Sequence, residues 1–466
     1  MRAIRAAALV IAAMTMHCLA GVQRTIPGPL EADAEVHVVL RVVQQQDATV
    51  AFKVASIAAV RADGAQLPLE VRLPEVQGEL SPRELAWGRI EPGAYSGFSL
   101  KLAGASRTLA GNTTPLRVPD APLAVEAPFS VGRARAAVVR LDLDISASLE
   151  GLSLSPSLRP SIPPRPLPQL SGWCSSAGQH ELTLFDRRAR TVAEVWPMGR
   201  APWGLALDPV QYRLYAAISG EDEVRVFDAA AGGELGRIRL QPGDGPREVV
   251  LSPDRRTLLV ANSGSNTVSF VDPASLLETA RVQVGEAPTA LLVDRAGNRA
   301  YVFNARSSFV SVVDLARRAA VGSIATDYAP LRGAINRAGT RLYVVSQGSP
   351  YMTAYSLPDQ AQAGRVYVGL GTLAVKVDPA SDLLYVAQGG SHRLALFDPF
   401  SLMPIDFVDL PGDASYLAID DAENTMFGLM PEQRAAAVVD LATKQLLAVI
   451  DVGLDPRMLV LAGERN

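Results

Sequence analysis

A carboxylate recurs from about residue 170 onward, each time at the end of a short apolar, alternating run. The positions are Asp186, Asp228, Asp272, Asp314, Ser356, Asp398 and Asp440. Their spacing is 42 residues, except for 44 between Asp228 and Asp272. Carboxylates can transfer protons, hold metal ions or accept backbone N–H groups in turns. A turn segment follows each of them, and an Asp that begins a turn bonds the N–H groups just ahead of it. We therefore expect a structural role at all seven positions, performed more weakly by Ser356.

A fixed period of this length predicts a repeat architecture. Each unit also has an opening apolar run, such as WGLALD from Trp203, and a second run, such as LLVANSG from Leu258. A fourth run closes the unit, as in LAVIDVG at 447–453. Four short strands in about 42 residues are typical of a β-propeller blade.

The two ends of the repeat region indicate a closed ring. The first unit, 170–200, lacks an opening strand, and residues 457–462 form an opening strand with no unit after it. Together they would complete one blade and leave no free strand edge. The prediction is a seven-bladed propeller over 170–466, closed by a C-terminal strand.

The N-terminal part has a different pattern. Residues 31–150 alternate apolar and polar side chains, for example Val139, Leu141 and Leu143 around Arg140 and Asp142. This alternation favours half-buried antiparallel strands, so the fold class is all-β, with a sandwich of about seven strands over 21–150. Six prolines in 151–169 predict a semi-rigid linker that spaces the two domains apart.

Residues 1–20 have the charged start, short apolar run and small residues of a secretory signal peptide. We expect cleavage before Gly21 and export to the periplasm or cell surface, with no transmembrane segment in the mature chain. Lipid anchoring through Cys18 is the alternative. After cleavage before Gly21, Cys174 would be the single cysteine left, and we expect an inert buried thiol. The net charge is −4 with no basic stripe, so no nucleic-acid partner is expected.

The run LLVANSGSNTVSFVD at 258–272 resembles the YVTN-type β-propeller repeat of bacterial and archaeal surface proteins. The resemblance covers about 170–466. It implies a group of seven-bladed propellers that includes lactonases, surface-layer proteins and propeller subunits of quinoprotein amine dehydrogenases. The N-terminal part resembles a bacterial β-sandwich family of unknown function, through the turn Pro92-Gly93-x-Tyr95 and the later strand VVRLDLDIS.

No catalytic constellation, metal site or cofactor site is predicted. The chain has no Cys-x-x-Cys-His and no Gly-x-Ser-x-Gly motif, and His37, His180 and His392 are far apart in sequence. His180 and His392 follow equivalent strands, so they are either solvated loop residues or members of a common rim. The acidic run 221–223 is either a solvated turn or a calcium ligand set.

The best candidate for a site is positional, because the residue after each inter-blade turn should lie at one end of the central channel. These residues are Trp203, Arg247, Thr289, Leu331 or Arg332, Leu373, Tyr416 and Arg457. Arginines and aromatic side chains on a concave rim suit an anionic or planar ligand, or a protein partner. The alternative is that they cap the channel and pair with carboxylates such as Asp244 and Asp455.

These features favour a binding or scaffold module of the envelope or surface over an enzyme. Its partner would be another envelope or surface protein, or a small anionic ligand. The alternatives are a lactonase-like hydrolase, a propeller subunit of a periplasmic redox enzyme, and a surface-layer component.

Overall fold

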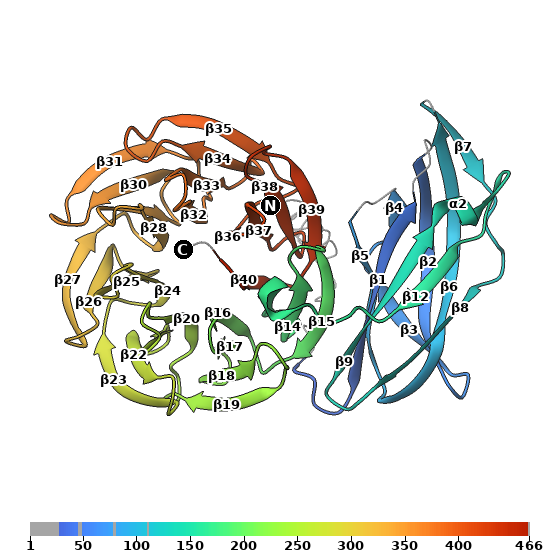
Figure 1. The fold of residues 1–466 in the computed structure, drawn as a ribbon, viewed down its shortest axis with the longest axis horizontal. Coiled ribbons are helices and arrows are strands. Elements are labelled where there is room, and N and C mark those ends of the chain that lie inside the picture. Colours follow the sequence, from blue (N-terminus) through green and yellow to red (C-terminus); the bar gives the residue numbers. More distant parts are fainter. Residues whose placement is uncertain (1–27, 45–48, 78–80, 110, 465–466) are drawn as a thin grey trace, which may run out of the picture.

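The computed structural model describes residues 28–44, 49–77, 81–109 and 111–464. It confirms the all-β prediction, with an N-terminal β-domain beside a seven-bladed propeller (Figure 1). The predicted signal peptide and Cys18 lie outside the described residues. Within the described part, no helix has the length and apolar character needed to cross a membrane.

The N-terminal domain contains twelve strands and one short helix. They are β1 (Ala34–Gln44), β2 (Thr49–Arg61), β3 (Gln66–Val71), β4 (Glu75–Gln77), β5 (Arg83–Ile90), β6 (Gly93–Leu109), β7 (Asn112–Leu116), β8 (Leu123–Val131), β9 (Ala136–Asp144), α2 (Ile145–Ser148), β10 (Leu149–Glu150), β11 (Ser153–Leu154) and β12 (Ser157–Ser161).

Ten of these strands form one sheet that curls around a single core. Its order is β12-β9-β1-β5-β3-β2-β6-β7, with β4 on β2 and β8 on β6. Because β3 pairs with both β2 and β5, it joins the two layers of the sandwich. Val36, Phe52, Phe98 and Leu141 are buried between the layers. The domain differs from the prediction in having more than seven strands and one parallel pair, β1 with β9.

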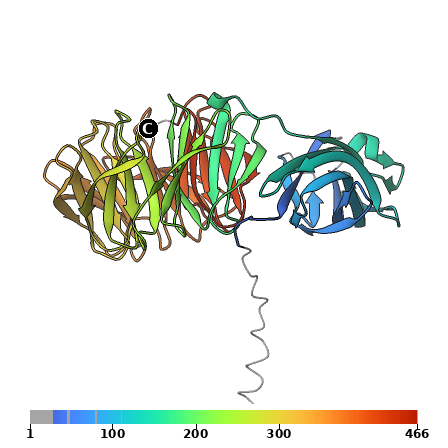
Figure 2. The same cartoon turned by 90° about the horizontal axis from the view of Figure 1, so that it is seen from below.

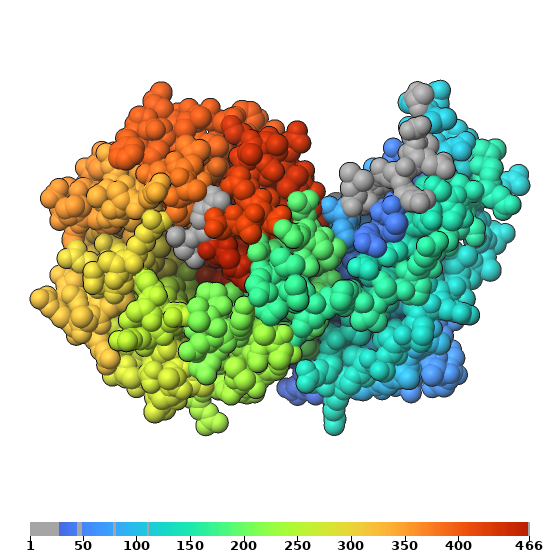
Figure 3. Space-filling model, viewed as in Figure 1, coloured from blue at the N-terminus to red at the C-terminus, as the bar shows by residue number. Residues whose placement is uncertain are grey.

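The segment 151–169 is partly structured and does not hold the domains apart. β12 pairs with β9, so residues 157–161 belong to the N-terminal sheet, and the 3-10 turn η1 (Pro168–Leu170) leads into the propeller. Val39 and Val138 pack against Val195 of the propeller. The two domains are in direct contact, and Figures 2 and 3 show them side by side.

The propeller has seven four-stranded blades. In chain order their strands are β13 (Ser171–Ser176), β14 (Glu181–Asp186) and β15 (Thr191–Pro197); β16 (Pro202–Asp208), β17 (Arg213–Ile218), β18 (Glu223–Asp228) and β19 (Glu234–Arg239); β20 (Pro246–Leu251), β21 (Leu258–Asn262), β22 (Thr267–Asp272) and β23 (Leu277–Gln283); β24 (Pro288–Val293), β25 (Arg299–Asn304), β26 (Phe309–Asp314) and β27 (Ala319–Ala325); β28 (Pro330–Ile335), β29 (Arg341–Ser346), β30 (Tyr351–Ser356) and β31 (Gln362–Tyr367); β32 (Ala374–Val377), β33 (Leu384–Gln388), β34 (Arg393–Phe397) and β35 (Pro404–Asp409); β36 (Tyr416–Asp420), β37 (Thr425–Met430), β38 (Ala435–Asp440) and β39 (Leu446–Asp451); and β40 (Pro456–Leu461).

The first blade is composite, as predicted. Its order is β15-β14-β13-β40, so the last strand of the chain is its innermost strand. Trp173 of β13 lies opposite Val460 of β40, and both are buried. Cys174 is fully buried in the same strand, and burial raises the pKa of its thiol well above the usual value. The ring is therefore closed, and the first blade has four strands like the other six.

The repeated aspartates hold the turn after the third strand of each blade. Asp186 Oδ1 accepts the N–H groups of Arg188 and Ala189 at 2.9 and 2.8 Å. Asp228 Oδ1 accepts those of Ala230 and Ala231 at 2.8 and 2.7 Å. Each carboxylate thus supplies acceptors for donors that have no strand partner.

Ser356 departs from this pattern for a local reason. The residue two positions on is Pro358, which has no N–H to donate. The Ser356 hydroxyl instead donates to Asp359 Oδ2, at 3.3 Å. In this turn the carboxylate belongs to Asp359, three residues after Ser356. Ser356 is a donor to it, so Ser356 does not act as a weaker aspartate.

This difference predicts the effect of a substitution. Asp228→Ala should lower the free energy of unfolding by about 1 kcal/mol, because two backbone donors lose their acceptor. Ser356→Ala is the matched control, and its effect should stay within about 0.5 kcal/mol. Denaturant unfolding of the two variants measures the difference. Equal losses would show that the carboxylate contributes nothing to the turn.

Candidate functional site

The centre of the propeller contains a cavity of about 630 Å³, lined by residues from the inner strand of every blade. Figure 3 shows the hollow at the centre of the ring. Most of its wall is apolar, including Leu205, Val250 and Leu292. The lining also includes the turns after the inner strands, such as Pro209 and Pro253, so the cavity extends toward the end where these strands finish.

Three predicted rim residues gather where the inner strands start, and we call Trp203, Arg247 and Arg457 the rim cluster. The Arg247 guanidinium lies 3.7 Å from the centroid of the Trp203 ring, and that of Arg457 lies 4.0 Å from it. Each of these residues lies at a β-bulge, where the pairing of the two innermost strands of its blade shifts in register. Such bulges re-aim side chains, which explains how three consecutive blades place theirs together.

The charges of the rim cluster are not balanced. Arg457 pairs with Asp455. Arg247 stacks on Trp203, but among the described residues no carboxylate oxygen lies within 4.0 Å of its guanidinium nitrogens. Burial and the nearby Arg457 lower the pKa of Arg247 from its usual value, although an arginine stays charged in proteins. The cluster therefore holds two arginines against one carboxylate, Asp455, which pairs with Arg457 and also attracts Arg247 from a longer distance.

A second group lies inside the channel, and we call Glu248, Arg332 and Tyr416 the channel triad. Arg332 Nη1 lies 3.3 Å from Glu248 Oε1, and the Arg332 guanidinium lies 4.7 Å from the Tyr416 ring centroid. Burial raises the pKa of both Glu248 and Tyr416. Glu248 Oε2 is buried and has no hydrogen-bond partner among the described residues. Nearby, Lys376 pairs with Glu464 at 2.9 Å.

The predicted rim residues thus fall into two groups. Trp203, Arg247 and Arg457 form the rim cluster. Arg332 and Tyr416 lie one repeat position further along and line the cavity, and Thr289 lies at the equivalent bulge of the fourth blade.

Glu248 was not among the predicted residues. The spacing in the sequence could have pointed to Glu248. Arg332 follows Glu248 by 84 residues, and Tyr416 follows Arg332 by 84 residues, which is two repeat periods. They therefore occupy one repeat position in alternate blades, and this position faces the channel.

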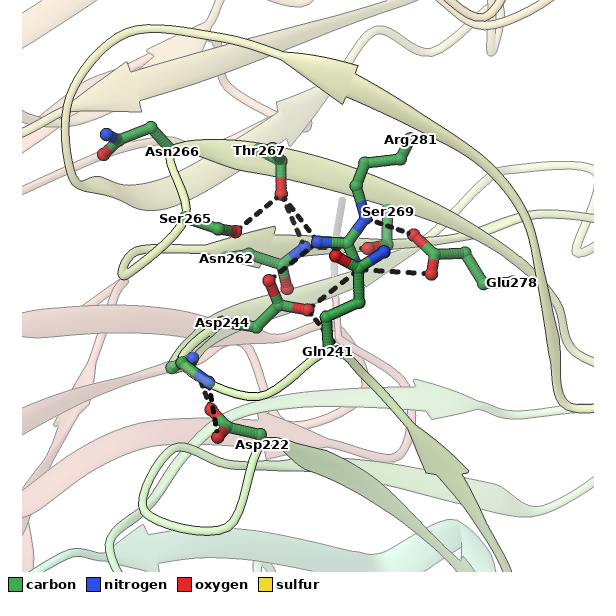
Figure 4. Close-up of polar contacts among 12 residues, drawn as sticks. Asp222, Gln241, Asp244, Asn262, Ser265, Asn266, Thr267, Ser269, Glu278 and Arg281 are labelled. Carbon is green, nitrogen blue, oxygen red and sulfur yellow. Dashed lines mark hydrogen bonds and ion pairs between the residues drawn. The ribbon is translucent and has the colours of Figure 1, made fainter.

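All three carboxylates of the acidic run in the second blade have partners within the protein. Glu221 and Glu223 both pair with Arg225, at 2.6 and 2.7 Å. Asp222 accepts two N–H groups from the loop 243–245 of the next blade, at 2.8 and 2.7 Å (Figure 4). These contacts favour the structural interpretation of the run over the calcium interpretation.

Asp244, one of the predicted counter-ions of the rim residues, pairs with Arg281 instead. Its two carboxylate oxygens accept from Arg281 Nη1 and Nη2 at 2.7 and 2.8 Å (Figure 4). Burial alone would raise the pKa of Asp244, but hydrogen bonds from Arg281, Ser265 and Gln241 hold it below its usual range. This network joins the buried Asp244, in an otherwise mostly exposed loop, to the edge of the third blade, and it leaves Arg247 without that carboxylate.

His180 and His392 occupy the same repeat position as Asp222. Their φ angles are 59°, 52° and 52°, in the left-handed region that Asp, Asn and His adopt more readily than other residues. His180 Nδ1 accepts the Ala201 N–H at 3.0 Å, and His392 Nδ1 lies 3.1 Å from Asp413 Oδ1. Each histidine contacts the first loop of the following blade, which is a structural role.

Comparisons with known proteins agree with the propeller fold. Residues 202–398 match the family model described as "Lactonase, 7-bladed beta-propeller". No curated protein matches the chain. Among solved structures, Kuenenia stuttgartiensis hydrazine synthase is 17% identical over 55% of this chain and 87% of that one, with a TM-score of 0.49. The structure titled "Dihydro-heme d1 dehydrogenase NirN in complex with DHE" is 15% identical over 66% of this chain and 78% of that one, with a TM-score of 0.51.

The fold and these matches define a class of protein. The C-terminal domain is a seven-bladed β-propeller that contacts an N-terminal curled β-sheet, and residues 202–398 of it are similar to the lactonase propeller family. At its low sequence identity, the likeness to the NirN structure extends to the fold alone.

Proposed function

We propose that this chain is an exported binding module of the cell envelope or surface. Its rim cluster takes an anionic group, either from another envelope protein or from a small ligand. The signal-like start of the sequence supports export. A rigid ring that presents three side chains from three blades supports a binding role.

One observation carries the proposal, namely the unpaired charge of Arg247. Three other cations at the channel have their own carboxylates: Arg457 with Asp455, Arg332 with Glu248, and Lys376 with Glu464. Arg247 has none among the described residues, and it is held in place by Trp203. A fixed guanidinium that makes no direct ion pair and shares the charge of Asp455 with a second arginine is suited to a carboxylate, sulfate or phosphate group.

Loss of Arg247 should weaken such binding. A charge-assisted hydrogen bond contributes about 1.5–3 kcal/mol, so Arg247→Ala should reduce affinity about ten- to a hundredfold. Citrate, sulfate and inorganic phosphate are suitable small probes, with thermal shift and calorimetry as readouts. Immobilised protein exposed to envelope fractions tests for a protein partner that carries the acidic group.

The matched control is Arg365→Ala. Arg365 also stacks on an aromatic ring, that of Tyr351 at 4.2 Å, but it pairs with Asp327 and lies on the outer strand β31. Its loss should leave binding unchanged. The proposal fails if Arg247→Ala and Arg365→Ala retain the same ligands or partners with the same affinity.

A lactonase-like hydrolase is the second candidate, favoured by the family match over 202–398. In such a reaction Glu248 would take a proton from the attacking water, and Arg332 would stabilise the developing oxyanion. Incubation with δ-valerolactone in a pH-stat tests this. Turnover that is lost in Glu248→Gln but kept in Arg247→Ala would favour hydrolysis. Absence of turnover, together with Arg247-dependent anion binding, would favour the binding module.

A further inference from the structure

His37 is buried at the contact between the two domains. It lies on β1, with 5% of its side chain exposed, and its Nδ1 lies 2.8 Å from Glu84 Oε1 of β5. Its Nε2 points across the contact to Glu181 Oε2 of the propeller, 3.7 Å away. That separation is too long for a hydrogen bond. Both atoms are buried and have no hydrogen-bond partner among the described residues.

A third ligand-type side chain lies at the same point. Glu35 is two residues before His37 and therefore on the same face of β1. Its carboxylate is buried, and one atom from each of Glu35, His37 and Glu181 lies within 4.8 Å of the other two. A cavity of about 20 Å³ borders His37, Glu84 and Glu181. This space is enough for one ion or one water molecule.

We propose that Glu35, His37 and Glu181 form a binding site for one divalent transition-metal ion, of which Zn²⁺ is the representative, and that this ion links the two domains. Imidazole with two carboxylates is a donor set that suits Zn²⁺ and Mn²⁺. Three protein ligands leave one coordination position of the ion for a water molecule.

The geometry of His37 fits this role. A histidine that binds a metal through one nitrogen usually donates the other N–H to a carboxylate, which fixes the ring orientation. Glu84 occupies that position. With metal–ligand bonds of about 2.05 Å, two ligand atoms are about 3.3 Å apart at a tetrahedral angle and about 4.1 Å apart on opposite sides. The 3.7 Å between Nε2 and Glu181 Oε2 lies between these values.

The charge balance at the contact between the two domains is also compatible with a bound cation. Four carboxylates meet here, and three of them face an arginine. These pairs are Arg89 with Glu35 at 3.3 Å, Arg72 with Glu84 at 4.0 Å, and Arg83 with Asp451 at 3.1 Å. Glu181 faces only His37 among the described residues. Burial raises the pKa of Glu181 to about 8, so this charge is neutralised by a proton on the carboxyl itself, by a proton on the imidazole, or by a metal ion at the imidazole Nε2.

The proton is the competitor of the ion. Burial disfavours a charged imidazole, but Glu181, Glu84 and Glu35 outweigh it and raise the pKa of His37 to about 9. Metal ligands must be deprotonated, so the ion must displace the proton of His37, and binding should strengthen as the pH rises. Since the site is buried between domains, the ion should enter when they separate or as the chain folds.

The experiment uses the full chain, stripped with EDTA and then refolded at pH 8 with equimolar Zn²⁺ or Mn²⁺. After gel filtration, elemental analysis should find one Zn²⁺ per chain, and the Tm should rise by several degrees. X-ray absorption at the zinc edge should show nitrogen and oxygen ligands without sulfur. Retention of neither ion would overturn the proposal and leave the cavity as a water site.

Variants locate the ion. His37→Gln and Glu181→Gln should weaken Zn²⁺ binding at least a hundredfold, and Glu84→Gln should weaken it about ten- to a hundredfold. His180→Gln, a histidine outside the cluster, is the matched control and should bind like the parent chain. Circular dichroism confirms that each variant is folded. Equal Zn²⁺ retention by His37→Gln and His180→Gln would also overturn the proposal.

Discussion

Arg187→Ala should lower the free energy of unfolding by about 3–5 kcal/mol. Arg187 is 5% exposed, and its Nη1 donates to Oδ1 of Asp420, which is fully buried in the seventh blade. Its Nε donates to the Gln169 carbonyl oxygen at 2.9 Å, so one side chain ties the linker, the first blade and the seventh blade together. Without the guanidinium, the buried Asp420 carboxylate would keep the N–H groups of Ala422 and Glu423 as hydrogen-bond donors, but it would lose its counter-ion.

Urea unfolding at neutral pH measures this loss, and the neighbouring residue is the control. Arg188 is 66% exposed and pairs with Glu423 at 2.7 Å, so Arg188→Ala should cost less than about 1 kcal/mol. The double variant Arg187→Met, Asp420→Leu should regain much of the loss, because it removes both charges. A loss under 1 kcal/mol for Arg187→Ala would show that water already reaches this pair.

The sequence predicted those features of the fold that depend on local chemistry repeated at a fixed interval. Asp186 and Asp228 make the same two turn bonds because each turn has free N–H groups in the same places. The missing first strand and the surplus last strand were equally visible, and the pairing of β13 with β40 confirms them. Ser356 differs from the prediction, because Pro358 has no N–H to donate and the Ser356 hydroxyl donates to Asp359 instead.

The sites were harder to predict because they depend on which blades face each other. Position in the repeat placed Trp203 and Arg247 at the channel end, but Arg332 and Tyr416 are one residue further along and lie inside the channel. The contact of His37 with Glu181 spans 144 residues and two domains. The repeat spacing carries no information on how the N-terminal sheet packs against a blade, so this contact could not be predicted from it.

Ring closure and the rim cluster depend on the same strand. β40 contributes Arg457 to the cluster and completes the first blade. Binding at the rim should therefore be sensitive to how well the ring is closed, since Trp203 is held between arginines from β20 and β40. Substitution experiments at Arg457 alone cannot separate these two roles of the strand.

A chain truncated after Asp455 separates them. Met458, Leu459, Val460 and Leu461 are all at least nine-tenths buried, and each contributes about 1.5–3 kcal/mol. Their joint loss, on the order of 10 kcal/mol, is comparable to the total stability of a typical domain, about 5–15 kcal/mol. The truncated chain should therefore lose its cooperative thermal transition and aggregate through the exposed edge of β13.

A synthetic peptide of residues 456–464 should restore that transition when it is added during refolding, whereas a scrambled peptide of the same composition should not. The same peptide with Arg457→Ala should also restore folding, because the apolar side chains that fill the blade remain. It should not restore full binding of citrate, sulfate or phosphate, because Trp203 then has one arginine instead of two. If both peptides restore folding and binding equally, Arg457 acts only through ring closure and the rim cluster binds through Arg247 alone. If the truncated chain melts cooperatively without any peptide, β40 is not what closes the ring.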